Sequence, residues 1–378
     1  MKNSIYQQVL GGLLVLLAAA SCVDPYRPPE IAAPASYLVV NGFFDSTPGA
    51  TTSIRLSRSQ NLSDKNAPTA ESGATVTIES ARNAIYTLQE SPGGIYSLAG
   101  ITPVSGETYR LHIRTAAGGD YVSDYVPVVK APPIDSVHWT VENDGVQFNV
   151  STHDPTNRTR YFRWEFDETW AYTSAYYSGY IYNDKTKAVE LRQDNIFNCW
   201  SSTSSKNILT TSTARLSQAI VNRFPLTFVD GQSMKFQRRY SLLVRQYALT
   251  QAGYNYYDQL AKITQNVGSL FDPQPSQLTG NMRSTSNPAD LVLGFFWAGD
   301  VKTKRIFIGR AQLPNWRTAT GYELCDVDTL SLAQIQKTQP GIMAESGMPG
   351  PLYLTTTFEC IDCRMQGGIN KKPDFWDE

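Results

Sequence analysis

The sequence predicts a mostly β fold in two consecutive domains. The first is expected to be an immunoglobulin-like or carboxypeptidase-regulatory-like β-sandwich, and the second a larger β-sandwich-type domain with an inserted helix. Short runs in which apolar and polar residues alternate, separated by Gly, Pro, Asn and Ser, indicate antiparallel strands. A chain of 378 residues, 41% of them hydrophobic, also has enough apolar material for two cores.

The first segment, residues 1–21, is typical of a lipoprotein signal peptide. A single Lys precedes an apolar run over 9–20 that is too short to span a bilayer comfortably, and small residues stand directly before Cys22. An ordinary secretory signal with an incidental cysteine is the alternative. The lipoprotein interpretation predicts that Cys22 is lipidated and starts the mature chain, held in the membrane at about 0.8 kcal/mol per buried CH₂.

The next segment, residues 22–36, is rich in Pro and predicts a spacer between the lipid and the folded part. No later stretch approaches the roughly 20 apolar residues of a membrane span, so we expect the remainder to be soluble and extracytoplasmic. The 33 Lys and Arg residues balance 34 Asp and Glu residues and form no basic block. Nucleic acid is therefore not expected as a partner.

The predicted N-terminal sandwich covers residues 37–131. Its strand candidates are YLVVNGFF, TTSIRLSRS, ATVTIES, AIYTLQE, ETYRLHIRT and GDYVSDYV, with a glycine-containing hairpin turn at 116–119. The stretch APPIDS, residues 131–136, marks the expected boundary with the second domain.

The second domain is expected over residues 132–358. DSVHWTV, VQFNVST, RYFRWEFDETWAYTSAYYSGYIYN and MKFQRRYSLLVRQYAL are long strand candidates, and DLVLGFFWAG and KRIFIGRAQ come later. Between them the period changes to that of a helix over about 250–268, with Thr250 as N-cap and Gly268 past its end. One face of this helix carries Tyr256, Leu260, Ile263 and Val267.

An aromatic stretch is the candidate for ligand binding. Side chains of one parity would share one face of an unbroken strand, and exposed rings there would form a platform for a glycan or peptide. The alternatives are that the rings pack two sheets together, or that Gly179 breaks the strand. The platform residues would be Trp170, Tyr172, Tyr176, Tyr180 and Tyr182.

No motif predicts catalysis, a metal or a cofactor. HExxH and GxSxG are absent, and the oxygen-rich turns lack the spacing of an EF-hand. On a strand, Glu165 and Asp167 would share one face and Glu168 the other, where they would pair with arginines rather than act as a catalytic set. We therefore expect a protein that is not an enzyme.

The cysteines after Cys22 indicate disulfides. CIDC could be half of a zinc site or a redox dithiol, but a second CxxC and a thioredoxin-like βαβ pattern are both missing. In an oxidising compartment two disulfides remain: Cys360 and Cys363 pair either with each other or with the two distant cysteines, which would fasten the tail, residues 359–378, to the body. The disulfide candidates are Cys199, Cys325, Cys360 and Cys363.

Several motifs together resemble one family. The lipobox cysteine followed by DPYRP, then LVVNG, YFRWEFDETW, YSLLVRQYALTQAGYNYYDQL, GSLFDPQPSQLTGN, LVLGFFWAG and CIDCRMQGG through KPDFW are similar to the uncharacterised lipoproteins of domain of unknown function 4249. The resemblance implies an outer-membrane lipoprotein of Bacteroidetes, facing the periplasm or the cell surface. It implies a TonB-dependent outer-membrane receptor as partner and transfers no catalytic residue.

We therefore expect an accessory, ligand-binding component of a TonB-dependent nutrient uptake system, held to the membrane by its lipid anchor. The alternative is a structural or adhesive lipoprotein of the cell envelope that binds no small molecule.

Overall fold

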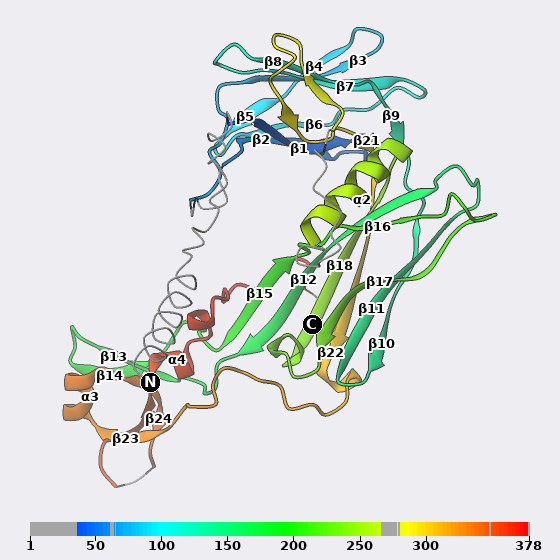
Figure 1. Ribbon diagram of the computed structural model, residues 1–378. Coiled ribbons are helices and arrows are strands. Elements are labelled where there is room, and N and C mark those ends of the chain that lie inside the picture. The colour runs from blue at the N-terminus through cyan, green and yellow to red at the C-terminus, as the bar shows by residue number, and fades with distance from the viewer. Residues whose placement is uncertain are drawn as a thin grey trace, which may run out of the picture.

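The computed structural model describes residues 36–60, 64, 66–265, 278, 280–347 and 349–376. The predicted signal peptide, Cys22 and nearly all of the spacer lie outside these residues. Within the described part of the chain, no helix combines the length and the apolar character needed to cross a membrane. The fold is mostly β, as predicted, and three bodies of strands account for it (Figure 1).

The N-terminal sandwich is one twelve-stranded sheet that folds over itself around a hydrophobic core. The order β19-β8-β7-β9-β21-β1-β2-β6-β5 runs through it, with β20 beside β1 and β3 pairing both β4 and β7. Its strands are β1 (Leu38–Asp45), β2 (Thr51–Arg58), β3 (Thr75–Ser80), β4 (Ile85–Thr87), β5 (Gln89–Ser91), β6 (Ile95–Ala99), β7 (Thr108–Arg114), β8 (Asp120–Ser123), β9 (Val126–Val129), β19 (Met282–Ser284), β20 (Val292–Leu293) and β21 (Ala298–Gly299).

The predicted domain boundary at residues 131 and 132 needs a correction, because strands from residues 282–299 return to this sandwich. β21 lies between β1 and β9 and pairs with both in parallel, and β19 pairs with β8. Phe296, fully buried, packs in the same core as Leu38 and Phe44. The first sandwich is therefore completed by a segment that the sequence places in the second domain.

The middle sandwich stacks a three-stranded sheet, β10-β11-β17, on a five-stranded one, β15-β12-β18-β22 with β16 beside β12. One apolar core, with Phe148, Trp164 and Leu242, lies between them. The strands are β10 (Ile134–Glu142), β11 (Gly145–Asp154), β12 (Tyr161–Thr173), β15 (Asn198–Ser204), β16 (Leu209–Ser212), β17 (Ala219–Asp230), β18 (Arg239–Ala248) and β22 (Val301–Gly309). Short 3₁₀ turns are η1 (Met234–Phe236) and η2 (Arg310–Gln312).

The C-terminal sheet is a separate body in the order β14-β13-β24-β25-β23. The sequence analysis merged it with the second domain. Its strands are β13 (Tyr180–Asn183), β14 (Ala188–Leu191), β23 (Asp328–Ser331), β24 (Gly341–Glu345) and β25 (Leu352–Thr356). The accompanying helices are α3 (Leu332–Thr338), α4 (Phe358–Ile361) and the 3₁₀ turn η3 (Cys363–Gln366). Figure 1 shows this sheet at the end of the molecule opposite the N-terminal sandwich.

The predicted helix is α2 (Gln251–Gln265). Thr250 caps it as expected, since its Oγ1 accepts a hydrogen bond from the backbone N of Gly253 at 3.1 Å. Its predicted end, with Val267 and Gly268, lies outside the described residues. Figure 1 shows α2 between the N-terminal sandwich and the strands β12, β16 and β18 of the middle sandwich. The helix therefore lies where two bodies of the protein approach each other.

Candidate functional site

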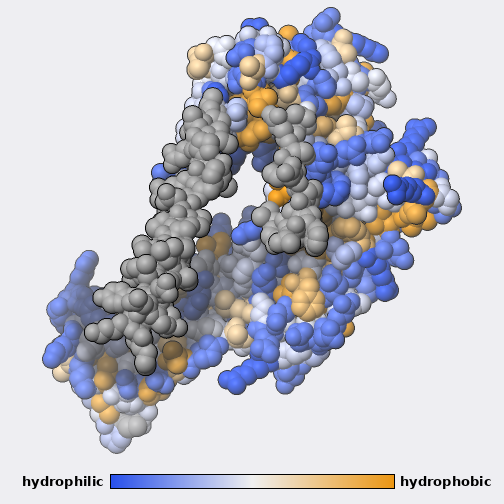
Figure 2. All heavy atoms as spheres, viewed as in Figure 1, coloured by the Kyte–Doolittle hydropathy of each residue, from blue (hydrophilic) through white to orange (hydrophobic). Residues whose placement is uncertain are grey.

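The interdomain cleft is a cavity of about 770 Å³ between the N-terminal sandwich, the five-stranded middle sheet and α2. This volume is in the range of small-molecule sites. Figure 2 shows hydrophobic residues on the lower side of the N-terminal sandwich, which faces this region. The lining that matters below consists of Val39, Asn41, Phe43, Ser53, Arg55, Ile95, Arg163, Glu165, Tyr247, Tyr256, Tyr257, Leu260, Ile263, Leu293, Phe295 and Trp297.

The first wall is the outer face of β1 and β2. Leu38, Val40 and Phe44 point into the sandwich core, so the alternate residues of β1 point outward into the cleft. In the antiparallel register Asn41 stands opposite Arg55. β1 therefore carries apolar side chains on both faces. On its outer face, the polar pair of Asn41 and Arg55 interrupts the apolar surface.

The second wall is the face of β12 and β18 that carries Arg163, Glu165 and Tyr247. Arg163 donates a short hydrogen bond to Oε1 of Glu165, and the Tyr247 hydroxyl donates to Oε2 of the same carboxylate at 2.7 Å. Both carboxylate oxygens of Glu165 are therefore engaged by neighbours in the wall.

The third wall is helix α2. Its Tyr256, Leu260 and Ile263 line the cleft on the face that the helical period predicts. The Tyr257 hydroxyl accepts a hydrogen bond from Nε1 of Trp297 at 3.2 Å, which joins the helix to the segment that returns to the N-terminal sandwich. α2 is thus held against both bodies.

Aromatic rings from all three walls form one cluster. Phe43 stacks on Trp297 with ring centroids 4.1 Å apart, and Tyr256 stacks on Phe295 at 5.2 Å. Such pairs add roughly 0.5–1.5 kcal/mol each beyond the area they bury. The cluster makes the cleft a rigid, largely apolar surface.

The electrostatics of the cleft centre on Arg163. Its guanidinium lies 4.3 Å from the ring centroid of Tyr257 and 5.3 Å from that of Tyr247, where the ring faces attract a cation. Burial alone lowers the pKa of Arg163, but Tyr257 and Glu165 more than offset it, so the guanidinium stays charged. Its Nε is buried and has no hydrogen-bond partner among the described residues. Burial also raises the pKa of Tyr256 to about 12, which keeps its hydroxyl neutral.

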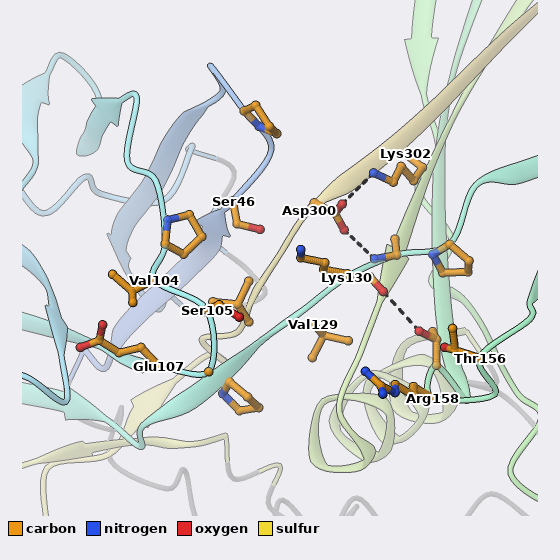
Figure 3. A pocket seen from close by; sticks show the side chains of 18 of the residues that line it. Ser46, Val104, Ser105, Glu107, Val129, Lys130, Thr156, Arg158, Asp300 and Lys302 are labelled. Atoms are coloured by element: carbon orange, nitrogen blue, oxygen red, sulfur yellow. Dashed lines mark hydrogen bonds and ion pairs between the residues drawn. The ribbon is translucent and has the colours of Figure 1, made fainter.

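A second cavity, of about 920 Å³, lies where residues 127–132 leave the N-terminal sandwich (Figure 3). Its buried carboxylates already have partners: Asp300 accepts from the backbone N of Ala131 at 2.5 Å and from Lys302 at 2.7 Å. Asp154 accepts backbone hydrogen bonds from Thr156 and Thr159. Burial would raise the pKa of Asp154, but a hydrogen bond from the Thr156 hydroxyl, together with these backbone hydrogen bonds, holds it at about 2. This cavity lies at the connection between two bodies, and its carboxylates fix loops.

The carboxylates of RWEFDETW do not converge. Glu165 faces the cleft, Asp167 forms an ion pair with Arg245, and Glu168 lies on the opposite face, where it accepts a hydrogen bond from the Tyr240 hydroxyl at 2.7 Å. The predicted division between the two faces is confirmed. Each of these groups has a structural partner.

The predicted aromatic platform is wrong as a single strand face. β12 ends at Thr173, before Gly179, and the chain crosses to another sheet, in which β13 begins at Tyr180. The cause is tertiary: the backbone of Gly179 already pairs with that of Met343 in the C-terminal sheet. The five rings concerned, Trp170, Tyr172, Tyr176, Tyr180 and Tyr182, are therefore divided between two sheets and the connection between them.

Two of these rings bond instead to the backbone of disulfide cysteines, one in the tail and one whose disulfide partner lies in the tail. The Tyr172 hydroxyl donates to the backbone oxygen of Cys363 at 3.0 Å, and the Tyr176 hydroxyl to that of Cys325 at 3.1 Å. The disulfides follow the alternative that fastens the tail to the body: Cys199 bonds to Cys363 and Cys325 to Cys360.

The sequence analysis missed the cleft as a site. Tyr256, Leu260 and Ile263 are predicted from the sequence only as one helix face, and Glu165 only as a carboxylate that pairs with an arginine. The signal was present in LVVNGFF, which is apolar at positions of both parities and so predicts burial on both faces of β1. Geometrically, the cleft can enclose an apolar body and hydrogen-bond one polar end.

Fold and cleft together define a mostly β protein with a cleft between two bodies. The chain belongs to the family described as domain of unknown function (DUF4249), whose family model matches residues 23–305. No curated protein matches it.

Among solved structures, a segment of two fibronectin type III domains from chicken tenascin matches at 13% identity, over 57% of this chain and 91% of that chain, with a TM-score of 0.16. The Yersinia pseudotuberculosis adhesin InvE matches at 12% identity, over 56% and 55% of the two chains, with a TM-score of 0.15. At such TM-scores neither likeness carries an argument here.

Proposed function

We propose that the protein is an outer-membrane lipoprotein that binds a small amphipathic ligand in the interdomain cleft and assists its uptake beside a TonB-dependent receptor. The observation that carries the proposal is the cleft itself, an aromatic-walled cavity of about 770 Å³ with a few polar groups. Sites of this kind bind ligands by apolar burial and orient them with few hydrogen bonds.

Anchoring at Cys22 and the receptor partner are parts of the same proposal. They rest on the lipobox and on the family resemblance rather than on the geometry. An anchored protein stays near the receptor, and tethering of this kind raises the effective concentration of ligand where it is needed. Binding, and not chemistry, is the proposed role, because the carboxylate of the described cleft lining, Glu165, is engaged by Arg163 and Tyr247.

A bulky side chain placed in the cleft tests the proposal, because it blocks the cleft and leaves the rest of the protein surface unchanged. Ser53 lines the cleft on β2, whereas the exposed Thr51, two residues earlier on the same strand, does not. A deletion strain carrying Ser53→Trp should fail to regain growth on the nutrient that the deletion affects, while Thr51→Trp should restore it.

Pull-down from gently solubilised membranes should recover a TonB-dependent receptor with all folded variants. The proposal is wrong if Ser53→Trp restores growth fully and no receptor is recovered. That result would favour the structural or adhesive alternative.

A further inference from the structure

We infer that the ligand of the interdomain cleft is an amphipathic anion, whose charged head is bound by Arg55 beside Asn41 and whose apolar body lies against the aromatic walls. The inference rests on the proposed binding function and names the chemistry of the ligand.

The lining of the cleft carries an excess of positive charge. Two guanidinium groups, of Arg55 and Arg163, face the cleft with one carboxylate, of Glu165, which leaves one positive charge in excess (2 − 1 = 1). Both oxygens of Glu165 are used by Arg163 and Tyr247. The Arg55 backbone pairs with β1 and β6, but its side chain has no hydrogen bond or ion pair among the described residues, so its charge is available to a ligand.

The position of Arg55 in the sheet suits the binding of an anionic head. In the strand register it stands between Asn41 on β1 and Ile95 on β6. Directly opposed side chains have Cβ atoms about 4.5–5.5 Å apart, so the Asn41 amide can share a bound oxygen with the guanidinium. Val39 and Leu293, also paired with each other, belong to the same cleft floor. A guanidinium fork matches a carboxylate with two parallel hydrogen bonds, and Arg55 and Asn41 are both exposed, so a ligand can reach them.

The hydrogen-bonding groups beside Arg55 also suit an anionic head. A neutral sugar needs donors and acceptors in similar number, whereas an anionic head needs donors only. The Arg55 guanidinium can only donate, and the Asn41 amide and the Ser53 hydroxyl, which can donate or accept, line the same wall. Arg163 does not bind the head in this scheme. It is a positioning residue, which holds the rings of Tyr247 and Tyr257.

The test uses two fluorescent probes that share one apolar body, 1-pyrenebutyrate and 1-pyrenebutanol, titrated against the full mature protein. The acid should bind at least about tenfold more tightly than the alcohol, as one charge-assisted hydrogen-bond pair allows. Arg55→Gln should lower the affinity for the acid to that for the alcohol and leave the affinity for the alcohol unchanged. Arg317→Gln, an exposed arginine that does not line the cleft, should change neither affinity.

Two competitors distinguish the sources of such an anion. Displacement of pyrenebutyrate by decanoate supports a free acid as the ligand. Displacement by acetyl-phenylalanyl-phenylalanine supports a peptide C-terminus. If neither competitor displaces pyrenebutyrate, the inference is overturned. Equal affinity for acid and alcohol, or discrimination that survives Arg55→Gln, also overturns it.

The same probes separate this inference from the proposed function. Ser53→Trp should abolish the binding of both probes, and unchanged binding would place them outside the cleft and overturn the inference. Discrimination that depends on Arg55, together with full growth of the Ser53→Trp strain, would instead remove the uptake role and support the anion site.

Discussion

At Arg163 three interactions meet on one side chain: a short hydrogen bond to Glu165 and the faces of two tyrosine rings. The side chain is only 15% exposed, so little water replaces a lost partner. Because burial of an unpaired charge is costly, Glu165 is needed to keep the guanidinium inside the wall.

We therefore predict that Glu165→Gln lowers the free energy of unfolding by about 2 kcal/mol, since hydrogen bonds to charged groups contribute roughly 1.5–3 kcal/mol. Urea unfolding measures the change. The control is Asp184→Asn, whose ion pair with Lys187 is exposed on both sides and should contribute less than about 0.5 kcal/mol. Equal effects of the two substitutions would contradict the role given to Glu165.

Asp154 gives a second prediction, on pH. Its pKa is about 2 in the folded protein, below the ordinary 3.8, because hydrogen bonds from Thr156 and Thr159 favour the charged form. A carboxyl with a lowered folded pKa stabilises the fold above its unfolded pKa and loses that effect as the pH falls through the folded value.

The free energy of unfolding should therefore drop between about pH 4 and pH 2. In the Asp154→Asn variant it should drop less steeply over the same range. Urea titrations at several pH values measure both slopes. An identical slope in wild type and variant would show that Asp154 does not contribute.

At the scale of the elements, local pattern predicted much of the fold. Alternation in TTSIRLSR corresponds to β2, whose buried residues alternate with exposed ones, and the period of 3.6 corresponds to α2. Long-range pairing was not predictable in this way. β20 and β21 are two residues long, and their place beside β1 depends on contacts with strands about 170 to 250 residues earlier.

Phe296 tests that long-range pairing. It is fully buried in the N-terminal core, although the sequence places it in the second domain. Phe296→Ala should lower the free energy of unfolding by about 3–5 kcal/mol, as other buried Phe→Ala changes do. It should also speed amide hydrogen exchange in β1 more than in β11. Phe228→Ala, at a ring 47% exposed on β17, is the matched control and should cost about 1 kcal/mol or less. Faster exchange in β11 instead would contradict the assignment.

At the scale of the whole molecule, the cleft draws its walls from residues 39–55, 163–165, 247–263 and 293–297. No local motif can encode such a site, because each wall is an ordinary strand or helix until the N-terminal sandwich, the middle sandwich and α2 come together. This is why the sequence indicated Tyr256 and Glu165 separately and not as neighbours around one cavity. The disulfides were more accessible to sequence reasoning, since four cysteines allow only three pairings.

The last prediction concerns how the molecule is held at the membrane. A lipidated Cys22 would carry acyl chains whose burial contributes about 0.8 kcal/mol per CH₂, and more than one chain gives stable anchoring. Cys22→Ser removes the thiol that forms the thioether bond, so the protein should move from the membrane pellet to the soluble fraction and lose the lipid from its intact mass. Washing membranes with alkaline carbonate separates an anchored protein from a peripherally attached one. If the Cys22→Ser variant withstands this wash as the wild type does, a protein surface or a second anchor holds the molecule, and the lipoprotein assignment is wrong.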